Sequence, residues 1–487
     1  PFEFQSSKSL LAFAGRDIVD TGFRIQNVNP NDVSVIAAGR DIFYPDSRGP
    51  TGSIRPNTRL IEVSGPGRLD LLAGRNINLG SMQGLLSVGN QGIPPGIPGN
   101  PALADVGASL SLFAGLSQEP DYGGFIDTFF AGVPKYDVEL RNYVERLTGD
   151  KLQSDAALQR FRGLPRRLQR ELIVSVLLGE IREAGAKAAG SGLFEDYLPA
   201  YAAINTLFPG HVDVDADLKT ATPTDKWQGD VQLFFSTIRT VDEGDINIFA
   251  PGGSVNVGLA VTTNSTKDPS QLGIVAQKLG DVSAVVRDNF LVNQSRVFAL
   301  DGGDITLWTS TSNIDAGRGA KTAVSAPAPV TTTDADGNVT TVFSPATAGS
   351  GIQTAVSTPG RDAGAGFLFA PVGVVDFSDA GASFAGSLVV GAGQVLNQLN
   401  VDVAGPTVGV PAVDTASVAA GLTGVSSLAS TTSKLAEQSA TGMGETDAAA
   451  LETKASLLLI EVLGLGDSED REKREGLGDS EDRKKRK

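Results

Sequence analysis

The sequence predicts a mainly β protein, a right-handed parallel β-helix (β-solenoid) with an α-helical insertion. Three observations lead to this fold class. A short phrase of apolar residues around Gly-Arg-Asp recurs near the start of the chain. Gly makes up 58 of the 487 residues, more than the usual share of about 7%, without the period of three found in collagen. One internal segment changes from a strand-like period of two to a helical period.

The recurring phrase occurs at Leu10–Ile18, Val35–Ile42 and Leu71–Ile77. Each copy is a short apolar strand, a Gly and a second short strand. The Gly returns after 24 and then after 35 residues, and periods of about 20 to 50 residues are typical of solenoids. A single unit of this size cannot bury its apolar face, whereas stacked units bury it against each other. We therefore expect one coil per phrase, with Gly supplying a positive φ at the corner.

The helical period covers about residues 125–210. Leu164, Leu168 and Leu172 recur at i, i+4 spacing, and the charged residues lie mostly off this stripe. This pattern predicts an α-helical insertion that packs on the flank of the solenoid. After it, Gly-Asp-Ile phrases such as Gly244–Ile246 indicate that the solenoid resumes.

These patterns predict a division of the chain into six segments. In chain order they are solenoid turns (1–124), the helical insertion (125–210), solenoid turns (211–323), a hairpin or loop excursion (324–358), a C-terminal solenoid with a loose Ala/Ser/Thr-rich part (359–466) and a charged repetitive tail (467–487).

Composition excludes several classes of function. The net charge of −16 argues against a nucleic-acid partner, because phosphate contacts require a clustered basic face. The absence of Cys excludes disulfides and cysteine-ligated metals, and no apolar run is long enough to predict a membrane span. No cofactor is expected. The first residue is Pro1 rather than Met, which indicates a processed product or a fragment.

The run Ser295–Thr322, with its Asp-Ala-Gly-Arg-Gly-Ala-Lys-Thr end, resembles the C-terminal region of filamentous-haemagglutinin exoproteins. The Gly-Arg-Asp phrases, Ala202–Gly210 and Ile460–Gly464 resemble the same region, so the resemblance covers most of the chain. It implies a secreted or cell-surface bacterial protein of the two-partner (type V) secretion type, exported through an outer-membrane transporter. It also implies a role in adhesion, aggregation or biofilm formation.

We therefore expect an adhesin or structural exoprotein and not an enzyme. Its partners would be a host-cell or matrix glycan or protein, or neighbouring bacterial cells. Two alternatives remain open at this point. Asp301, Asp304 and Asp315 near the Gly-rich corners could serve a β-helical polysaccharide-cleaving enzyme, although Asp after Gly is also an ordinary corner choice. The chain could also be the stalk of a contact-dependent toxin system.

One strand pattern is a weak candidate for a metal site. If residues 211–217 form a strand, alternation would place the side chains of His211, Asp213, Asp215 and Asp217 on one face, where they could bind a divalent cation. A solvated strand face explains the same alternation, so no metal is predicted. The run Asp334–Asn338 starts like a calcium loop but lacks its final Glu, and we interpret it as a hairpin turn. The weak metal candidates are His211, Asp213, Asp215 and Asp217.

Two further sets of side chains are candidates for partner contact. Arginines follow the corner glycines and could bind anionic glycans, but pairing with nearby Asp17, Asp41 and Asp315 is the favoured interpretation. Aromatic residues in and before the helical insertion could contact a partner if they lie at the surface, or could attach the helices to the solenoid. The arginines are Arg16, Arg40, Arg75 and Arg318. The aromatic candidates are Tyr122, Phe125, Phe129, Phe130, Tyr197 and Tyr201.

Overall fold

The computed structural model describes residues 2–45, 47–48, 54–55, 57–90, 100–259, 272–318, 330–333, 339–342 and 349–411. The described residues belong to one compact unit, Pro1–Val413. The predicted turn at Asp334–Asn338, most of the predicted loose segment and the charged tail at 467–487 lie outside the described residues.

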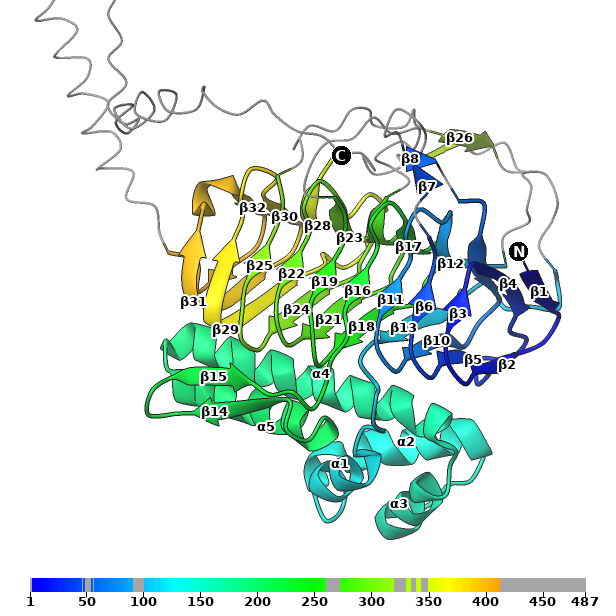
Figure 1. Ribbon diagram of the computed structural model, residues 1–487, viewed down its shortest axis with the longest axis horizontal. Coiled ribbons are helices and arrows are strands. Elements are labelled where there is room, and N and C mark those ends of the chain that lie inside the picture. Colours follow the sequence, from blue (N-terminus) through cyan, green and yellow to red (C-terminus); the bar gives the residue numbers. More distant parts are fainter. Residues whose placement is uncertain are drawn as a thin grey trace, which may run out of the picture. The chain divides into compact units, whose positions relative to one another are not determined.

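The strands form three parallel stacks, and successive coils contribute one strand to each stack (Figure 1). The first stack contains β2 (Leu11–Ala14), β5 (Val33–Ala38), β10 (Arg68–Ala73), β13 (Ser109–Phe113), β18 (Ile246–Ala250), β21 (Val282–Val286), β24 (Ile305–Thr309), β29 (Gly366–Asp376), β31 (Leu388–Leu396) and β33 (Thr407–Val408).

The second stack contains β3 (Ile18–Val19), β6 (Ile42–Phe43), β11 (Ile77–Asn78), β16 (Val231–Gln232), β19 (Val255–Asn256), β22 (Phe290–Leu291) and β25 (Ile314–Asp315), and it continues in the ends of β29 and β31. The third contains β1 (Phe2–Ser6), β4 (Thr21–Gln26), β9 (Leu60–Ser64), β12 (Gly84–Gly89), β17 (Thr237–Thr240), β20 (Gly273–Ala276), β23 (Arg296–Leu300), β28 (Gly351–Ala355), β30 (Ala382–Phe384) and β32 (Val401–Val403). This arrangement confirms the predicted β-solenoid; its handedness stays a prediction.

The core lies between the three stacks because every second side chain of a strand points inward. In β10, Leu69 and Leu71 point inward and lie in register with Leu110 and Leu112 of β13, and all four are fully buried. The same columns of aliphatic residues continue through later coils and form one hydrophobic cluster. Stacking therefore buries what no single coil could bury.

The corner glycines are required for a reason other than the one predicted. Gly39 and Gly74 of the recurring phrase are absent from the residues with positive φ. Instead, a Cβ at Gly39 would lie 2.3 Å from the carbonyl oxygen of Gly15, and one at Gly74 would lie 2.1 Å from that of Gly39. Glycine is present because the coils approach each other too closely at this corner for any side chain.

A polar ladder follows the same corner from coil to coil. The Asp17 carboxylate accepts the backbone N–H of Asp41 (3.2 Å), and Asp41 accepts that of Asn76 (3.0 Å). Asn76 in turn accepts the N–H of Asp230 (3.0 Å), which accepts that of Ser254 (2.8 Å). The side chain after the corner thus caps a backbone group of the next coil, which explains why Asp and Asn recur there.

The helical insertion enters at the corner between β13 and β16, within a single coil. Figure 1 shows α4 lying along the first stack, and α4 contacts strands β24, β29, β31 and β33. In order, the insertion contains α1 (Tyr122–Phe129), η1 (Pro134–Tyr136), α2 (Asp137–Thr148), α3 (Ser154–Arg162), α4 (Arg166–Ser191), η2 (Phe194–Tyr197), α5 (Leu198–Leu207), and the antiparallel pair β14 (Val212–Asp215) and β15 (Thr220–Pro223).

Two smaller excursions also leave the solenoid at corners. Strands β7 (Ser47–Arg48) and β8 (Ile54–Arg55) pair antiparallel between β6 and β9. Strands β26 (Val330–Thr333) and β27 (Val339–Val342) pair antiparallel between β25 and β28, in the segment where the sequence predicts a hairpin. A short 3₁₀ turn, η4 (Gln398–Asn400), precedes β32. Among the described helices, none combines the length and apolar character needed to cross a bilayer.

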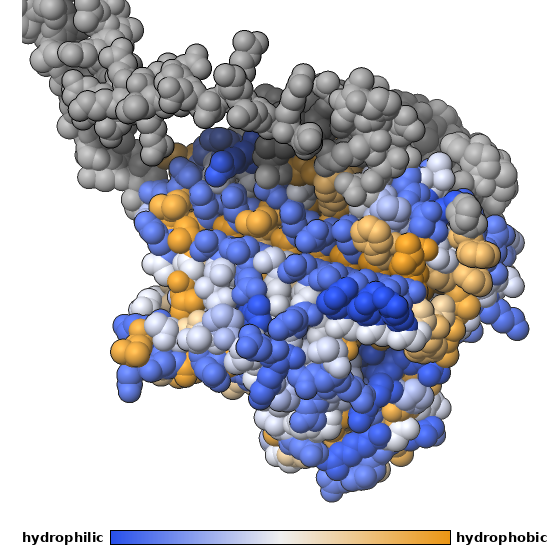
Figure 2. All heavy atoms as spheres, in the orientation of Figure 1, coloured by the Kyte–Doolittle hydropathy of each residue, from blue (hydrophilic) through white to orange (hydrophobic). Residues whose placement is uncertain are grey.

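The exposed apolar residues are not evenly distributed. In Figure 2 the visible surface of the helical insertion is largely hydrophilic, and apolar residues gather over the solenoid. Exposed Phe4, Leu11, Phe13 and Val19 all belong to the strands of the first described coil. These strands have a paired neighbour on one side only, which leaves part of their apolar surface uncovered.

Candidate binding groove between the long helix and the solenoid

The outward side chains of the first stack form two neighbouring rows. They arise from alternation, since residues two apart on each strand face the same way and the parallel register aligns them between coils. The aromatic row is Leu72, Phe113, Phe249, Val285, Trp308 and Phe369. The polar row is Asp70, Ser111, Asn247, Ser283 and Thr306.

The helical insertion covers the aromatic row. The Trp308 ring lies 5.2 Å from the Tyr201 ring and 6.1 Å from that of Tyr197, both nearly edge-on. Helix α4 comes so close to β29 that a Cβ on Gly185 would lie 2.5 Å from the ring of Phe369. The aromatic row and the inner faces of the helices therefore form one hydrophobic cluster, separate from the solenoid core.

This cluster favours the second of the two interpretations of the aromatic candidates, attachment of the helices to the solenoid, over partner contact. Tyr122, Phe125, Phe130, Tyr197 and Tyr201 are all buried. Phe129 is partly buried, and its ring stacks on that of Phe125 at 4.4 Å. They attach the helices to the solenoid, because an aromatic stripe at helical spacing is the face that a helix buries.

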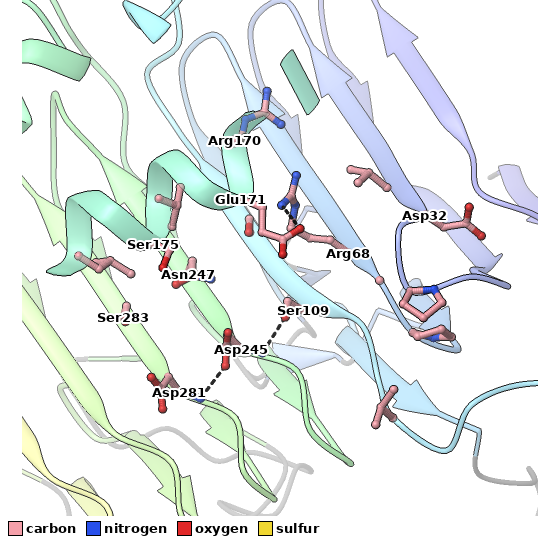
Figure 3. Close-up of a pocket in the computed structure, with 18 of the residues that line it drawn as sticks. Asp32, Arg68, Ser109, Arg170, Glu171, Ser175, Asp245, Asn247, Asp281 and Ser283 are labelled. Atoms are coloured by element: carbon pink, nitrogen blue, oxygen red, sulfur yellow. Dashed lines mark hydrogen bonds and ion pairs between the residues drawn. The ribbon is translucent and has the colours of Figure 1, made fainter. Parts of the chain in front are cut away.

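A groove remains between α4 and the polar row. Its volume is about 540 Å³, within the range of about 300 to 1,000 Å³ typical of ligand pockets. Figure 3 shows Asn247 and Ser283 of the polar row at its floor, α4 on one side and the aspartates Asp245 and Asp281 on the other. From α4, the side chains of Val174, Ser175 and Leu178 line it.

A buried ion-pair network closes one end of the groove. Asp70, fully buried, pairs with Arg68 (Nε to Oδ1, 2.7 Å) and with Nη1 of Arg170. Arg170 also donates from Nε to the hydroxyl of Tyr122 (3.0 Å), and Arg68 lies 3.5 Å from Glu171. The network joins the solenoid to α4, because Asp70 belongs to β10 and Arg170 to the helix.

A second polar ladder forms the opposite wall. Ser109 accepts the N–H of Asp245 (3.0 Å), Asp245 accepts that of Asp281 (3.0 Å), and Asp281 accepts that of Asp304 (2.9 Å). Arg182 of α4 reaches across to Asp281 (3.2 Å) and to the hydroxyl of Thr306 (2.7 Å). Burial raises the pKa of Asp245 to about 6, although the N–H of Asp281 favours its charged form.

The floor contains a hydroxyl without a partner. Ser283 is 1% exposed, and its Oγ forms no hydrogen bond. Its neighbours Val282 and Ala284 point into the solenoid core, so Ser283 points outward to the groove that it lines. A buried hydroxyl with no partner costs about 1–3 kcal/mol.

The weak metal candidates do not come together. His211 is fully buried, with Nδ1 2.6 Å from the carbonyl oxygen of Pro251 and Nε2 2.7 Å from the hydroxyl of Ser310. Burial lowers the pKa of His211 to about 4, so it is neutral at physiological pH. Asp213, Asp215 and Asp217 are exposed, and no group of three potential metal ligands occurs among the described residues.

The aspartates near the Gly-rich corners act as backbone caps. Asp301 accepts hydrogen bonds from the N–H groups of Ser357 (2.6 Å) and Thr358 (3.0 Å). Asp304 accepts the N–H of Ala365 (2.8 Å), and Asp315 that of Gly317 (2.8 Å). Capping of backbone groups thus accounts for these aspartates near the Gly-rich corners.

Two of the corner arginines, Arg40 and Arg75, pair with aspartates of the preceding coil. Arg40 binds Asp17 (2.5 Å), and Arg75 binds Asp41 through Nε at 2.9 Å. Arg16 lies 3.3 Å from Asp17 with most of its side chain exposed. These hydrogen bonds lower the pKa of Asp17 and of Asp41.

Sequence reasoning did not find the groove, although its signal is visible. In Gly244–Phe249 and Gly303–Trp308 the corner Asp is followed by a polar residue two positions later and an aromatic residue four positions later. Large aromatic residues on the outward side of a strand indicate that something covers this face. Only the position of α4 decides which row is covered and which remains open.

Comparison with known proteins gives one match. Residues 302–412 match the family described as filamentous haemagglutinin family outer membrane protein. Neither the curated proteins nor the solved structures contain a match. The matched residues run from β24 through β33, so they include the last described coils of the solenoid. The C-terminal part of the described solenoid is thus similar to filamentous haemagglutinin family outer membrane proteins, which agrees with a secreted or cell-surface location.

Proposed function

We propose that this chain is a non-enzymatic scaffold that mediates attachment, aggregation or biofilm formation at a bacterial surface. The match of residues 302–412 to the filamentous haemagglutinin family carries the proposal. The stacked coils support it, because a solenoid provides a long and stable surface for display of binding sites. Export through a dedicated outer-membrane transporter, as in two-partner secretion, is part of the same proposal. The partner would be a host-cell or matrix glycan or protein, or a neighbouring cell.

The roles of the corner aspartates favour a scaffold over an enzyme. Asp301 and Asp304 each accept a backbone N–H of the following coil, and Asp315 accepts that of Gly317, two residues later in the same turn. A general acid or base needs a lone pair or proton directed at substrate. Carboxylates whose oxygen atoms already cap backbone groups are poorly placed for this task.

A polysaccharide-cleaving activity in the groove is a second candidate, and Asp245 is the observation in its favour. Burial raises the pKa of Asp245 to about 6, the property expected of a general acid, and Asp281 lies beside it. The N–H of Asp281 donates to Asp245, so the same pair also has a structural role.

One experiment separates the two candidates. The chain would be displayed on an inert, non-adherent bacterium, and adhesion to cultured cells and self-aggregation would be measured beside an undecorated strain. Purified chain would be incubated with a panel of polysaccharides, and new reducing or unsaturated ends would be counted. A scaffold increases adhesion or aggregation and releases no ends. Release of ends that Asp245→Asn abolishes would establish the enzyme instead.

A further inference from the structure

We propose that the groove between α4 and the polar row binds a neutral sugar unit of a glycan. This inference rests on the proposed adhesive function and deepens it by naming the ligand class and its site. The geometry that supports it consists of a floor of uncharged polar groups, a wall of hydrogen-bond acceptors, an apolar wall, and arginines that are already paired.

The floor supplies groups that hydroxyls can satisfy. The buried Oγ of Ser283 has no partner within the protein. Ser111 and Asn247 precede it in the same row, and both line the groove. A buried hydroxyl is stabilised by a ligand group that both donates and accepts, which is the property of a sugar hydroxyl. An apolar ligand would leave the Ser283 hydroxyl unsatisfied.

The side walls match the two faces of a sugar ring. Asp245 and Asp281 present carboxylates, which accept hydrogen bonds from ring hydroxyls. Opposite them, Val174 and Leu178 of α4 offer apolar surface for the C–H face of the ring. Pockets that bind small ligands combine apolar walls with a few placed polar groups, and the volume of about 540 Å³ lies within their usual range.

The charges of the groove exclude acidic sugars. Its arginines are engaged, Arg68 and Arg170 with Asp70, and Arg182 with Asp281 and Thr306. A carboxylate or sulfate on the ligand would face Asp245 and the already paired Asp281, while the arginines that line the groove are engaged with protein groups. The groove therefore selects neutral over anionic sugars. The corner arginines considered in the sequence would instead favour anionic glycans.

The test is saturation-transfer NMR and calorimetry on the full chain. The probes are neutral methyl glycosides and neutral di- and trisaccharides, compared with galacturonate, sialyllactose and heparin oligosaccharides. We expect binding of at least one neutral probe and no binding of the acidic ones. Binding of none of the neutral probes, or preference for an acidic probe, would overturn the inference.

Two variants place the site, and each has a matched control. Ser283→Ala removes the unpartnered hydroxyl and should weaken binding about three- to tenfold. Ser236→Ala is its control, since Ser236 Oγ is likewise buried without a partner but lies outside the groove. Ser175→Trp fills the groove from an exposed position of α4 and should abolish binding. Lys187→Trp, exposed on the same helix outside the groove, should leave it unchanged.

The outcomes separate this inference from the proposed function. Sugar binding that Ser283→Ala and Ser175→Trp leave intact contradicts the groove as the site. If these variants lose sugar binding but the displayed chain never promotes adhesion or aggregation, the groove is confirmed as the sugar-binding site and the adhesive function is contradicted. If adhesion persists in both variants and no neutral sugar binds, the function stands and the inference fails.

Discussion

The aromatic row and the polar row occupy the same strands, two residues apart, yet the helices cover the aromatic row and leave part of the polar row open. Phe249 and Trp308 of the aromatic row are buried under the helices and join the insertion to the solenoid. Asn247 and Ser283 of the polar row lie beside α4 and line a groove. The comparison teaches that a repeated strand pattern can provide an attachment surface and a candidate binding site side by side.

The two rows also differ in what holds them to the helix. The aromatic row depends on ring contacts and burial of apolar area, as between Trp308 and Tyr201. The polar row touches α4 through charged contacts at its ends, Asp70 with Arg170 and Thr306 with Arg182. Substitutions in the aromatic row should therefore affect stability more than those in the open part of the polar row.

The largest effect is expected for Trp308→Ala. The indole is fully buried, and its removal leaves a cavity between β24 and η2 and α5, so the free energy of unfolding should fall by about 3–5 kcal/mol. Urea denaturation would measure this loss. Limited proteolysis should also show faster cleavage within the helical insertion.

Phe298→Ala is the matched control for Trp308→Ala. Phe298 is also buried, but it belongs to β23 of the third stack and to a separate small cluster. It should destabilise the solenoid without selectively exposing the insertion to protease. Equal cleavage of the insertion in both variants would show that the aromatic row is not what holds the helices.

A smaller loss of stability is expected for Asp70→Asn, at the end of the polar row that the ion-pair network closes. The amide keeps the shape and one acceptor but removes the charge that neutralises buried Arg68 and Arg170. We expect a loss of about 2–3 kcal/mol in the free energy of unfolding by urea denaturation. Asp376→Asn, at a partly exposed corner, should change stability far less. An Asp70→Asn variant as stable as the wild type would contradict a structural role for the network.

The smallest effect is a pH dependence at the open wall of the groove. Burial raises the pKa of Asp245 from its usual 3.8 to about 6, so folding favours the protonated carboxyl. The protonated carboxyl of Asp245 contributes to the free energy of unfolding below pH 4. This contribution is lost as the pH rises towards 6, and above that value the free energy no longer changes because of Asp245. Asp245→Asn should remove this slope, on the order of 1 kcal/mol once solvent near the carboxylate is allowed for.

The measurement is the difference in unfolding free energy between wild type and Asp245→Asn across pH 4 to 7. Taking the difference cancels the contributions of carboxylates whose pKa is lowered, such as those of Asp17 and Asp41, because these contributions are the same in both proteins. A difference that does not vary with pH would show that Asp245 is not desolvated.

Much of the fold was visible in local patterns. The repeated phrases at Leu10–Ile18 and Val35–Ile42 predict strand, corner and strand, and these residues form β2, β3, β5 and β6. The candidate site was not predicted, because Asn247 and Ser283 lie 36 residues apart in sequence and become neighbours only through the register of β18 and β21.

The sequence by itself determined the solenoid, because the strand period of two and the recurring corner are local properties that each coil repeats. It also determined that a helical segment interrupts the coils. The tertiary structure alone decided which face the helices cover. Tyr197 and Tyr201 looked the same in sequence whether exposed or buried, and the choice depended on aromatic rings from β18, β24 and β29, which only stacking brings together. Covering those rings removes apolar surface from water, and the polar row beside them is left open.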